Sequence, residues 1–274
     1  MTLQEAYNYS VYFLGANGVD EEEFKAKCLV CQLAKIANRD YQNHLEDLIS
    51  QKKLADGLWK LKSGTPLQYV LGEWDFLDST FAVGEGVLIP RPETEELALL
   101  GIELVKQMDG APIVWDLCAG SGCIGISVAK ACPGAQVFCV EKSTEAFAYL
   151  QKNALPYTNV RPLLADIGGD LTDLPKPQVV LSNPPYIATE TLPHLQPEVQ
   201  KEPRMALDGG ADGLDFYRLL ADKIAPSLDK DTKLLLEIGD EQGRAVKALF
   251  GKCKNVQIRQ DIYGKDRILT ATVA

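Results

Sequence analysis

The sequence predicts an α/β protein in which a small all-helical N-terminal domain precedes a doubly wound parallel sheet that ends in an antiparallel C-terminal hairpin. Three observations lead to this fold class. The first 62 residues show helical periodicity only, short apolar runs alternate with helical segments after Pro90, and the last 18 residues or so contain two strand-like runs around a turn. Alternation of strands and helices is typical of a parallel sheet covered on both faces.

The N-terminal region has signals for several helices. Thr2 and Glu5 fit a capping box, and an apolar stripe at helical spacing runs from Leu45 to Leu61. The stretch Ser63–Pro66 ends the pattern because glycine and proline interrupt helices. We therefore expect a helical domain over residues 1–67.

The next segment, residues 68–88, mixes aromatic and aliphatic residues with Gly and Asp, which predicts a connecting β-hairpin. A third region, residues 89–274, should then form the sheet domain. Its parallel strands are expected at 113–115, 136–140, 160–164, 179–181 and 234–238. The final hairpin should turn at Tyr263–Asp266.

Composition restricts the class of protein. The chain has 274 residues, of which 46% are hydrophobic, and no apolar run reaches the ~20 residues that span a bilayer. The N-terminus lacks the pattern of a secretory signal. Seven cysteines, an odd number, favour reduced thiols over a disulfide framework. We expect a soluble, cytoplasmic monomer without membrane attachment.

Neither a metal site nor direct binding to nucleic acid is expected. Cys28 and Cys31 form a CxxC inside a helical apolar pattern, which indicates a core helix, and only two histidines are present. The net charge is −10, with 8 basic and 9 acidic residues in positions 1–70 and 20 and 29 in the remainder. Proteins that grip nucleic acid normally carry a basic stripe, and none is visible.

A Gly-rich turn follows the first expected strand. Asp116 ends that strand, Gly120, Gly122 and Gly125 have G-x-G-x-x-G spacing, and Glu141 ends the second strand. Such a turn lets the backbone approach a ligand, and the acid can accept hydrogen bonds from ribose hydroxyls. These features predict an adenosine-containing ligand, either a dinucleotide or S-adenosylmethionine.

Asp116 favours S-adenosylmethionine over a dinucleotide. A carboxylate can interact with the cationic part of S-adenosylmethionine, whereas it would be poorly placed beside the pyrophosphate of a dinucleotide. Asp166, after the third strand, has two interpretations. It could accept a hydrogen bond from the adenine amino group, or it could simply cap a helix or loop.

The motif SNPPYI follows the fourth strand. Prolines cannot continue a strand ladder, so Pro184 and Pro185 predict a rigid loop at the carboxyl edge of the sheet, where ligands bind in such folds. Asn183 and Pro184 offer carbonyl acceptors that could orient the N–H bonds of a planar amide or amine, and Tyr186 could stack on it. A purely structural turn would account for the prolines but not for the whole motif.

Several stretches together carry a family resemblance: QYVLGEWDF, VLIPRPETEEL, SNPPYI, EPRMALDGGADGLDFYR and LLLEIGDEQG. With the helical N-terminus they resemble the peptide chain release factor glutamine methyltransferases, the HemK/PrmC family, over essentially the whole chain. The resemblance implies a Rossmann-like S-adenosylmethionine-dependent methyltransferase fold. It also implies methylation of the glutamine amide in the Gly-Gly-Gln loop of class I release factors, with S-adenosylhomocysteine as the second product.

The resemblance also implies site residues. Asn183, Pro184, Pro185 and Tyr186 would hold the substrate amide, while the helical domain would hold the body of the release factor. The implied cofactor contacts are Cys118, Ala119, Gly120, Ser121, Gly122, Glu141, Ile167 and Asn183. Cys118 stands where the family usually has glycine, so a positive φ there would strain the backbone.

Other residues and other functions stay open from sequence. The stretch Pro90–Thr94 could form a wall near the cofactor or cap a helix, and Arg204 could brace the site or form an exposed ion pair. An adenine-N6 methyltransferase acting on DNA or RNA would need a basic surface to hold its substrate. A nicotinamide-dependent oxidoreductase would leave SNPPYI unexplained, and a non-catalytic release-factor-binding adaptor would not depend on Asn183.

Overall fold

The computed structural model describes residues 1–274 as two compact units. The helical unit comprises residues 1–73 together with residues 196–201, and the sheet unit comprises the rest. The helical unit contains α1 (Leu3–Ala16), α2 (Glu22–Ala34), a 3₁₀ turn (Asn38–Asn43), α3 (Gln51–Lys62) and α4 (Leu67–Leu71).

Local signals place these helices largely as predicted. Thr2 and Glu5 form the expected capping box at the start of α1. The third helix is shorter than the apolar stripe implied, since α3 begins at Gln51 and Leu48 is exposed. Cys28 and Cys31 are buried in α2 as free thiols.

The connecting hairpin is also shorter than residues 68–88. Residues Leu67–Leu71 form α4, and the strands are β1 (Glu73–Phe76) and β2 (Ser79–Ala82). Gly72, with φ 80°, ends α4 in the left-handed conformation that glycine adopts at little cost. The alternation of residues in YVLGEW therefore reflects one short helical turn followed by a strand.

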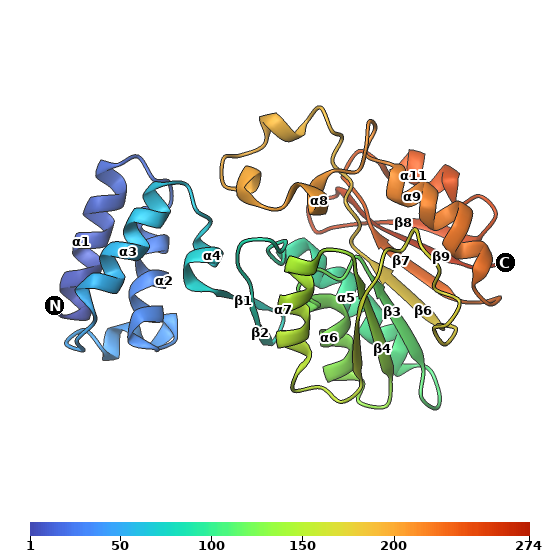
Figure 1. Ribbon diagram of the computed structural model, residues 1–274, viewed down its shortest axis with the longest axis horizontal. Coiled ribbons are helices and arrows are strands. Elements are labelled where there is room, and N and C mark those ends of the chain that lie inside the picture. The colour runs from blue at the N-terminus through green and yellow to red at the C-terminus, as the bar shows by residue number, and fades with distance from the viewer. The chain divides into compact units, whose positions relative to one another are not determined.

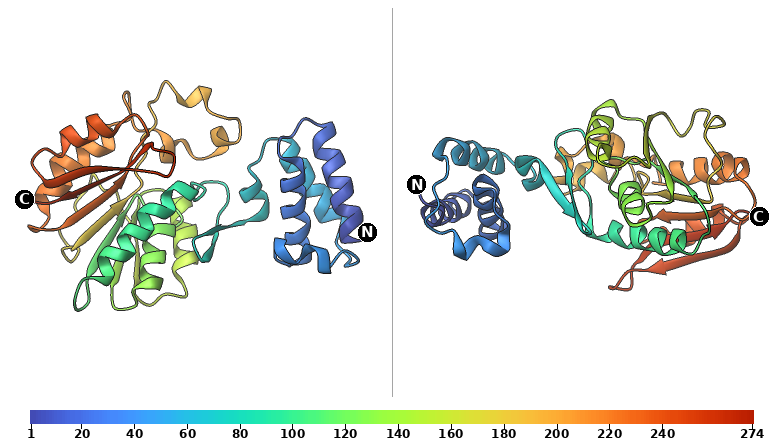
Figure 2. Two further views of the ribbon diagram at one scale, coloured as in Figure 1. Left: turned by 180° about the vertical axis from the view of Figure 1, so that it is seen from behind. Right: turned by 90° about the horizontal axis from the view of Figure 1, so that it is seen from below.

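The sheet unit confirms the predicted α/β class, with a seven-stranded sheet in the order β5-β4-β3-β6-β7-β9-β8 (Figures 1 and 2). Pairing is parallel from β5 to β7, and β9 runs antiparallel to both β7 and β8. The strands are β3 (Ile113–Leu117), β4 (Gln136–Glu141), β5 (Val160–Leu164), β6 (Val179–Ser182), β7 (Lys233–Glu237), β8 (Lys254–Gln260) and β9 (Asp266–Thr272).

Helices cover both faces of this sheet (Figure 1). One face carries α5 (Pro92–Lys106), α6 (Cys123–Ala131) and α7 (Thr144–Ala154), and the other carries α9 (Asp215–Leu219) and α11 (Gly243–Leu249). Side chains alternate along each strand, so Val114 and Leu235 belong to the first core and Trp115 and Leu236 to the second. None of the helices combines the length and the apolar composition that a membrane-spanning segment requires.

The order in which strands are added to the sheet changes sides at β3, because β4 and β5 lie on one side of it and β6 and β7 on the other. Strands β3 and β6 are parallel neighbours, with Leu117 paired to Ser182. The residues that follow, Cys118 and Asn183, therefore leave the same edge of the sheet side by side. This is the switch point at which ligands bind in doubly wound folds.

Candidate active site

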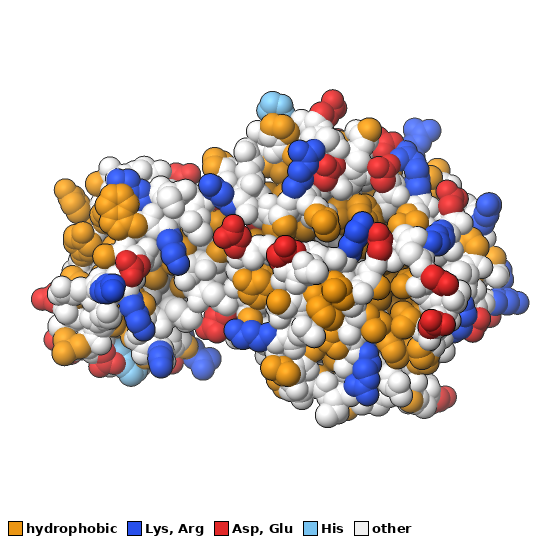
Figure 3. Space-filling view, viewed as in Figure 1, with side chains coloured by type: hydrophobic (Ala, Val, Ile, Leu, Met, Phe, Trp, Pro, Cys, Tyr) orange, Lys and Arg blue, Asp and Glu red, His pale blue; other side chains and the backbone are white.

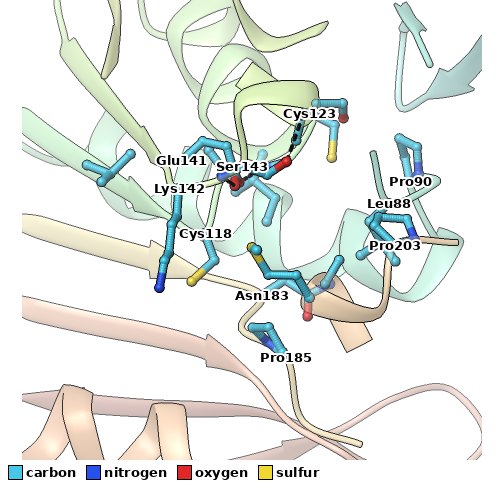
Figure 4. Close-up of a pocket in the computed structure, with 18 of the residues that line it drawn as sticks. Leu88, Pro90, Cys118, Cys123, Glu141, Lys142, Ser143, Asn183, Pro185 and Pro203 are labelled. Carbon is cyan, nitrogen blue, oxygen red and sulfur yellow. Dashed lines mark hydrogen bonds between the residues drawn. The ribbon is translucent and has the colours of Figure 1, made fainter. Parts of the chain in front are cut away.

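A cavity opens at the switch point (Figure 4). Asn183 and Pro185 lie on one side of it, Glu141, Lys142 and Ser143 on another, and Leu88, Pro90 and Pro203 on a third. Nine of the residues predicted from sequence line it: Cys118, Ala119, Gly120, Ser121, Glu141, Asp166, Ile167, Asn183 and Pro185. Four others, Asp116, Gly122, Pro184 and Tyr186, do not.

The Gly-rich turn is fixed by hydrogen bonds to residues at the end of β4. Ala119 donates its N–H to the Val140 carbonyl over 3.0 Å, and Gly120 donates to Glu141 Oε2 over 2.8 Å. Glu141 Oε1 accepts the N–H of Ser143 over 2.7 Å. The Glu141 carboxylate is thereby fixed at the cavity wall, and its remaining lone pairs can accept hydrogen bonds from a ligand.

Cys118 has the strained conformation that its position in the turn suggested. Its φ is 60°, within the left-handed region that costs residues other than glycine about 1–2 kcal/mol. Burial and nearby carboxylates raise the pKa of its thiol, so the side chain is a neutral wall of the cavity.

Asp116 holds the turn in place and does not line the cavity, which differs from the prediction that it would face a cationic ligand. Its side chain is completely buried, and Oδ2 accepts the N–H of Gly125 over 2.8 Å, while Oδ1 has no partner. Burial raises the pKa of this carboxyl group to about 7. We conclude that it ties the start of α6 to the end of β3.

Asp166 and Ile167 form the wall after β5. Asp166 pairs with Lys142 over 2.8 Å and accepts the N–H of Gly168, and these contacts lower its pKa. The residue therefore caps its own loop, as one of its two interpretations proposed, and it also lines the cavity, where its contact with an adenine stays a prediction. Ile167 is buried and adds an apolar surface there.

Asn183 is oriented by a residue that the sequence did not single out for this role. Its Nδ2 donates to Thr94 Oγ1 in α5 over 3.1 Å, which leaves Oδ1 as the acceptor available at the cavity. The carbonyl of Pro184 accepts no hydrogen bond from the chain. The role of these two carbonyl oxygens as acceptors for a substrate stays a prediction, since Asn183 lines the cavity and Pro184 does not.

Tyr186 differs from its predicted stacking position. It packs against the second core, and its hydroxyl faces Glu237 Oε1 over 3.5 Å. The loop is braced from outside by Gln242, whose Nε2 donates to the Tyr186 carbonyl over 2.9 Å. Gly209 packs on the same backbone, where an added Cβ would lie 2.8 Å from the Pro185 carbonyl oxygen.

Arg91 and Glu202 form a second brace that sequence reasoning missed. Glu202 is buried, pairs with the Arg91 guanidinium and accepts the N–H of Ile89 over 3.0 Å. This fixes the Pro90–Thr94 segment as one wall of the cavity, and the same segment begins α5 at Pro92, so its two interpretations hold together. Arg204 instead forms an exposed pair with Asp208 over 3.0 Å.

The residues present fit an adenosine-containing group. A fixed carboxylate, Glu141, stands at the end of the second parallel strand, and apolar surface is supplied by Val140, Ile124 and Ile167. Gly120 has open space where a Cβ would be, so its backbone can be approached closely. No three His, Cys, Asp or Glu side chains gather in a way that could hold a metal ion.

Comparisons with known proteins agree with this arrangement. A family model described as the PrmC N-terminal domain matches residues 5–72, and one described as a precorrin methyltransferase domain matches residues 102–207. The release factor glutamine methyltransferase of Moorella thermoacetica is 36% identical over 281 residues, covering 99% of this chain and 98% of that protein. The one from Bacillus cereus is 34% identical over 288 residues and 99% of each chain.

A solved structure supports the fold independently. The crystal structure of a methyltransferase from Pyrococcus furiosus superposes with a TM-score of 0.51 at 17% identity. It covers 70% of this chain and 87% of that one. At this identity the similarity concerns the fold alone.

Proposed function

Because the chain belongs to the release factor glutamine methyltransferase family, we propose that it methylates the side-chain amide nitrogen of the glutamine in the Gly-Gly-Gln loop of class I release factors, with S-adenosylmethionine as methyl donor. The observation that carries the proposal is the orientation of Asn183. Its Nδ2 is committed to Thr94, so that a carbonyl oxygen is presented at the cavity.

Several residues would hold the cofactor. Glu141 would accept hydrogen bonds from the ribose hydroxyls, and Ile167 would contact the adenine, with the Cys118–Ser121 turn close to the amino-acid portion. When bound, S-adenosylmethionine supplies an electrophilic methyl group. The apolar wall of Leu88, Pro90 and Pro203 would limit the access of water to the reacting atoms.

An amide nitrogen is a poor nucleophile because its lone pair is delocalised into the carbonyl group. Asn183 Oδ1 and the Pro184 carbonyl would accept its two N–H bonds, which orients the nitrogen and favours the pyramidal geometry needed for attack. As the new C–N bond forms, the bond between the methyl group and the sulfur would break to leave S-adenosylhomocysteine, and one N–H proton would pass to solvent. The chain contributes mainly positioning and fixed dipoles, in agreement with the absence of histidine at the cavity.

The helical unit would bind the body of the release factor. Hydrophobic side chains gather on the face of this unit seen in Figure 3. Tyr12 and Trp59 are 76% and 59% exposed, and Phe13 packs edge-on against Trp59. Exposed aromatic residues of this kind commonly contribute much of the energy of protein interfaces. A Trp59→Ala variant should raise KM for the release factor without changing kcat, and an unchanged KM would contradict this role.

A nucleic-acid substrate is less well supported. The net charge is −10, and acidic and basic side chains are interspersed on the face that Figure 3 shows. An adenine-N6 methyltransferase would need cationic surface to hold a phosphate backbone. A binding protein without catalysis would not require the ordered Asn183–Thr94 contact.

The test is methyl transfer from labelled S-adenosylmethionine to a purified class I release factor. A release factor with the loop glutamine replaced, and duplex DNA, serve as parallel substrates. We expect label on the intact release factor alone and a loss of about 100-fold or more in rate for Asn183→Ala. Label on DNA, or full activity of the Asn183 variant, would overturn the proposal.

A further inference from the structure

The contact between Asn183 and Thr94 does not by itself fix which end of the Asn183 amide faces the substrate. A threonine hydroxyl can donate or accept a hydrogen bond, so it could bind either the NH₂ group or the carbonyl of the amide. Only the orientation with Nδ2 toward Thr94 presents an acceptor to an incoming N–H. Some other group must impose the direction of this hydrogen bond.

Glu237 is placed to do so. It ends β7 and is 1% exposed, and its strand position directs the side chain to the same face as Leu235, where α5 and Thr94 lie. The Tyr186 hydroxyl faces its Oε1 over 3.5 Å, and the Thr94 hydroxyl is close enough to lower the pKa of the carboxyl group. Its Oε2 is buried and has no hydrogen-bond partner within the chain, so it can accept a hydrogen bond from a neighbouring hydroxyl.

We propose that Glu237 is a positioning residue whose ionised carboxylate, acting through the Thr94 hydroxyl, fixes the Asn183 amide with its oxygen toward the substrate. The inference rests on the proposed function, because it explains how the acceptor for the glutamine N–H is maintained. Glu237 does not line the cavity, so it acts through its neighbours and not on the reacting atoms.

The direction of the hydrogen bond between Thr94 and Asn183 depends on whether Glu237 is ionised or protonated. An ionised carboxylate only accepts, so the Thr94 hydroxyl donates to it and must then accept from Asn183 Nδ2. A protonated carboxyl group can donate to Thr94, which frees the hydroxyl proton to bind Asn183 Oδ1. The amide would then turn its NH₂ group to the cavity, where it opposes the substrate N–H bonds.

The groups around Glu237 place the protonation of its carboxyl group close to neutral pH. Burial raises the pKa of Glu237 to about 7, and Glu93 in α5 acts in the same direction. Thr94, Tyr186 and the Arg267 guanidinium in β9 lower it. On the remaining sides the Tyr217 hydroxyl binds the Glu237 main-chain carbonyl over 2.7 Å, and the Cys123 thiol, whose pKa is raised to about 12, stays neutral.

The first test compares the pH dependence of kcat in the wild type and in Glu237→Gln. Wild-type kcat should fall as the pH drops below about 7, because protonation releases the Asn183 orientation. Glutamine can both donate and accept, so the variant should lose about 10- to 100-fold in kcat, the cost commonly seen when an outer-shell partner is lost at metal sites. The remaining kcat of the variant should not show this fall below pH 7 (the acidic limb of the pH profile). KM for S-adenosylmethionine should be unchanged.

A second set of variants keeps the inference testable if Glu237→Gln does not fold. Thr94→Val removes the hydroxyl and should lose kcat to a similar extent, whereas Thr94→Ser should restore it. Adding Glu237→Gln to Thr94→Val should cause little further loss, because both changes interrupt one chain of contacts. Thr232→Val is the matched control, since Thr232 is 3% exposed against 2% for Thr94 and donates only to the Pro177 carbonyl.

The outcomes separate this inference from the proposed function. Absence of methyl transfer by the wild type at every pH would overturn the function itself. An active wild type whose acidic limb persists in Glu237→Gln would overturn the role of Glu237 alone. So would a Thr94→Val variant with the same kcat as Thr232→Val.

Discussion

Cys118 combines a strained backbone with a position in the cofactor turn. Its φ of 60° would suit glycine, yet its side chain packs against the second core beneath the cavity. The neighbouring Gly120 and Gly122 also have positive φ values, 56° and 83°, so three residues of the turn share this geometry. The thiol therefore offsets, through packing, part of the strain that its own Cβ introduces.

We expect Cys118→Gly to be more stable than Cys118→Ala by about 1 kcal/mol. Both variants remove the thiol, but only alanine retains the Cβ that disfavours a positive φ. Urea-induced unfolding of the two variants measures the difference. Equal stability, or a more stable alanine variant, would show that the turn relaxes to a different backbone conformation.

The site residues that the sequence could predict are those whose position in a motif already determines where they lie in the fold. Glu141 and Asn183 follow strands whose carboxyl ends meet at one edge, so they could be predicted. Thr94 and Glu202 act through contacts with residues 89 and 113 positions away, and no local pattern reveals such a partner. Glu237 did carry a signal, since an acid ending a buried run of leucines resembles Asp116 at the end of β3.

At the scale of elements, the position of α6 on the sheet depends on Gly125. A Cβ at this residue would lie 2.6 Å from Cys139 Sγ in β4 and 2.9 Å from Asp116 Cβ in β3. Both neighbours are fully buried, so neither can move aside freely. The last glycine of the motif therefore permits close packing of helix and strand, and keeps its N–H within reach of Asp116.

Gly125→Ala should destabilise the sheet unit by about 1–3 kcal/mol, the usual cost of an added methyl group in a packed core. It should also weaken cofactor binding, because α6 carries the end of the Gly-rich turn. Gly134→Ala is the control, since a Cβ there meets only the Gly110 carbonyl oxygen at 3.6 Å. Thermal unfolding and titration with S-adenosylmethionine test both effects, and equal behaviour of the two variants would contradict the argument.

The elements that sequence predicted well are those with one dominant periodicity. The five parallel strands agree with their predicted ranges to within two residues at either end. Helix α4 was missed because its five residues are too few to show a helical period and run directly into β1. The inclusion of residues 196–201 in the helical unit depends on long-range contacts such as that between Lys25 and Glu198, which a sequence pattern does not encode.

At the scale of the whole molecule, two groups of carboxylates respond to pH in opposite ways. Burial raises the pKa of Asp116 and Glu237 to about 7, from ordinary values of 3.8 and 4.5. Hydrogen bonds and ion pairs lower the pKa of Asp78, Asp166, Asp208, Asp212, Asp240 and Asp261. The carboxylates with a lowered pKa stabilise the fold at every pH above about 4, and they lose this contribution only in stronger acid.

The carboxyl groups with a raised pKa determine how the unfolding free energy changes between pH 5 and pH 7.5. There the unfolded chain has already released the protons of Asp116 and Glu237, while the folded chain still binds them, so the unfolding free energy must fall as the pH rises toward 7. We expect the protein to be at least about 1 kcal/mol more stable at pH 5 than at pH 7.5.

Urea-induced unfolding across this range, in the wild type and two variants, tests the expectation. Glu237→Gln removes one of the buried carboxyl groups whose pKa is raised and should flatten the dependence, because its amide has no proton to release. Asp212→Asn changes an exposed carboxylate that is ionised in both states above pH 5, so it should leave the slope as it is. A wild type that becomes more stable toward pH 7.5 would show that these two carboxylates are already ionised in the fold at pH 5. The Asn183 orientation would then also hold without change throughout the physiological range.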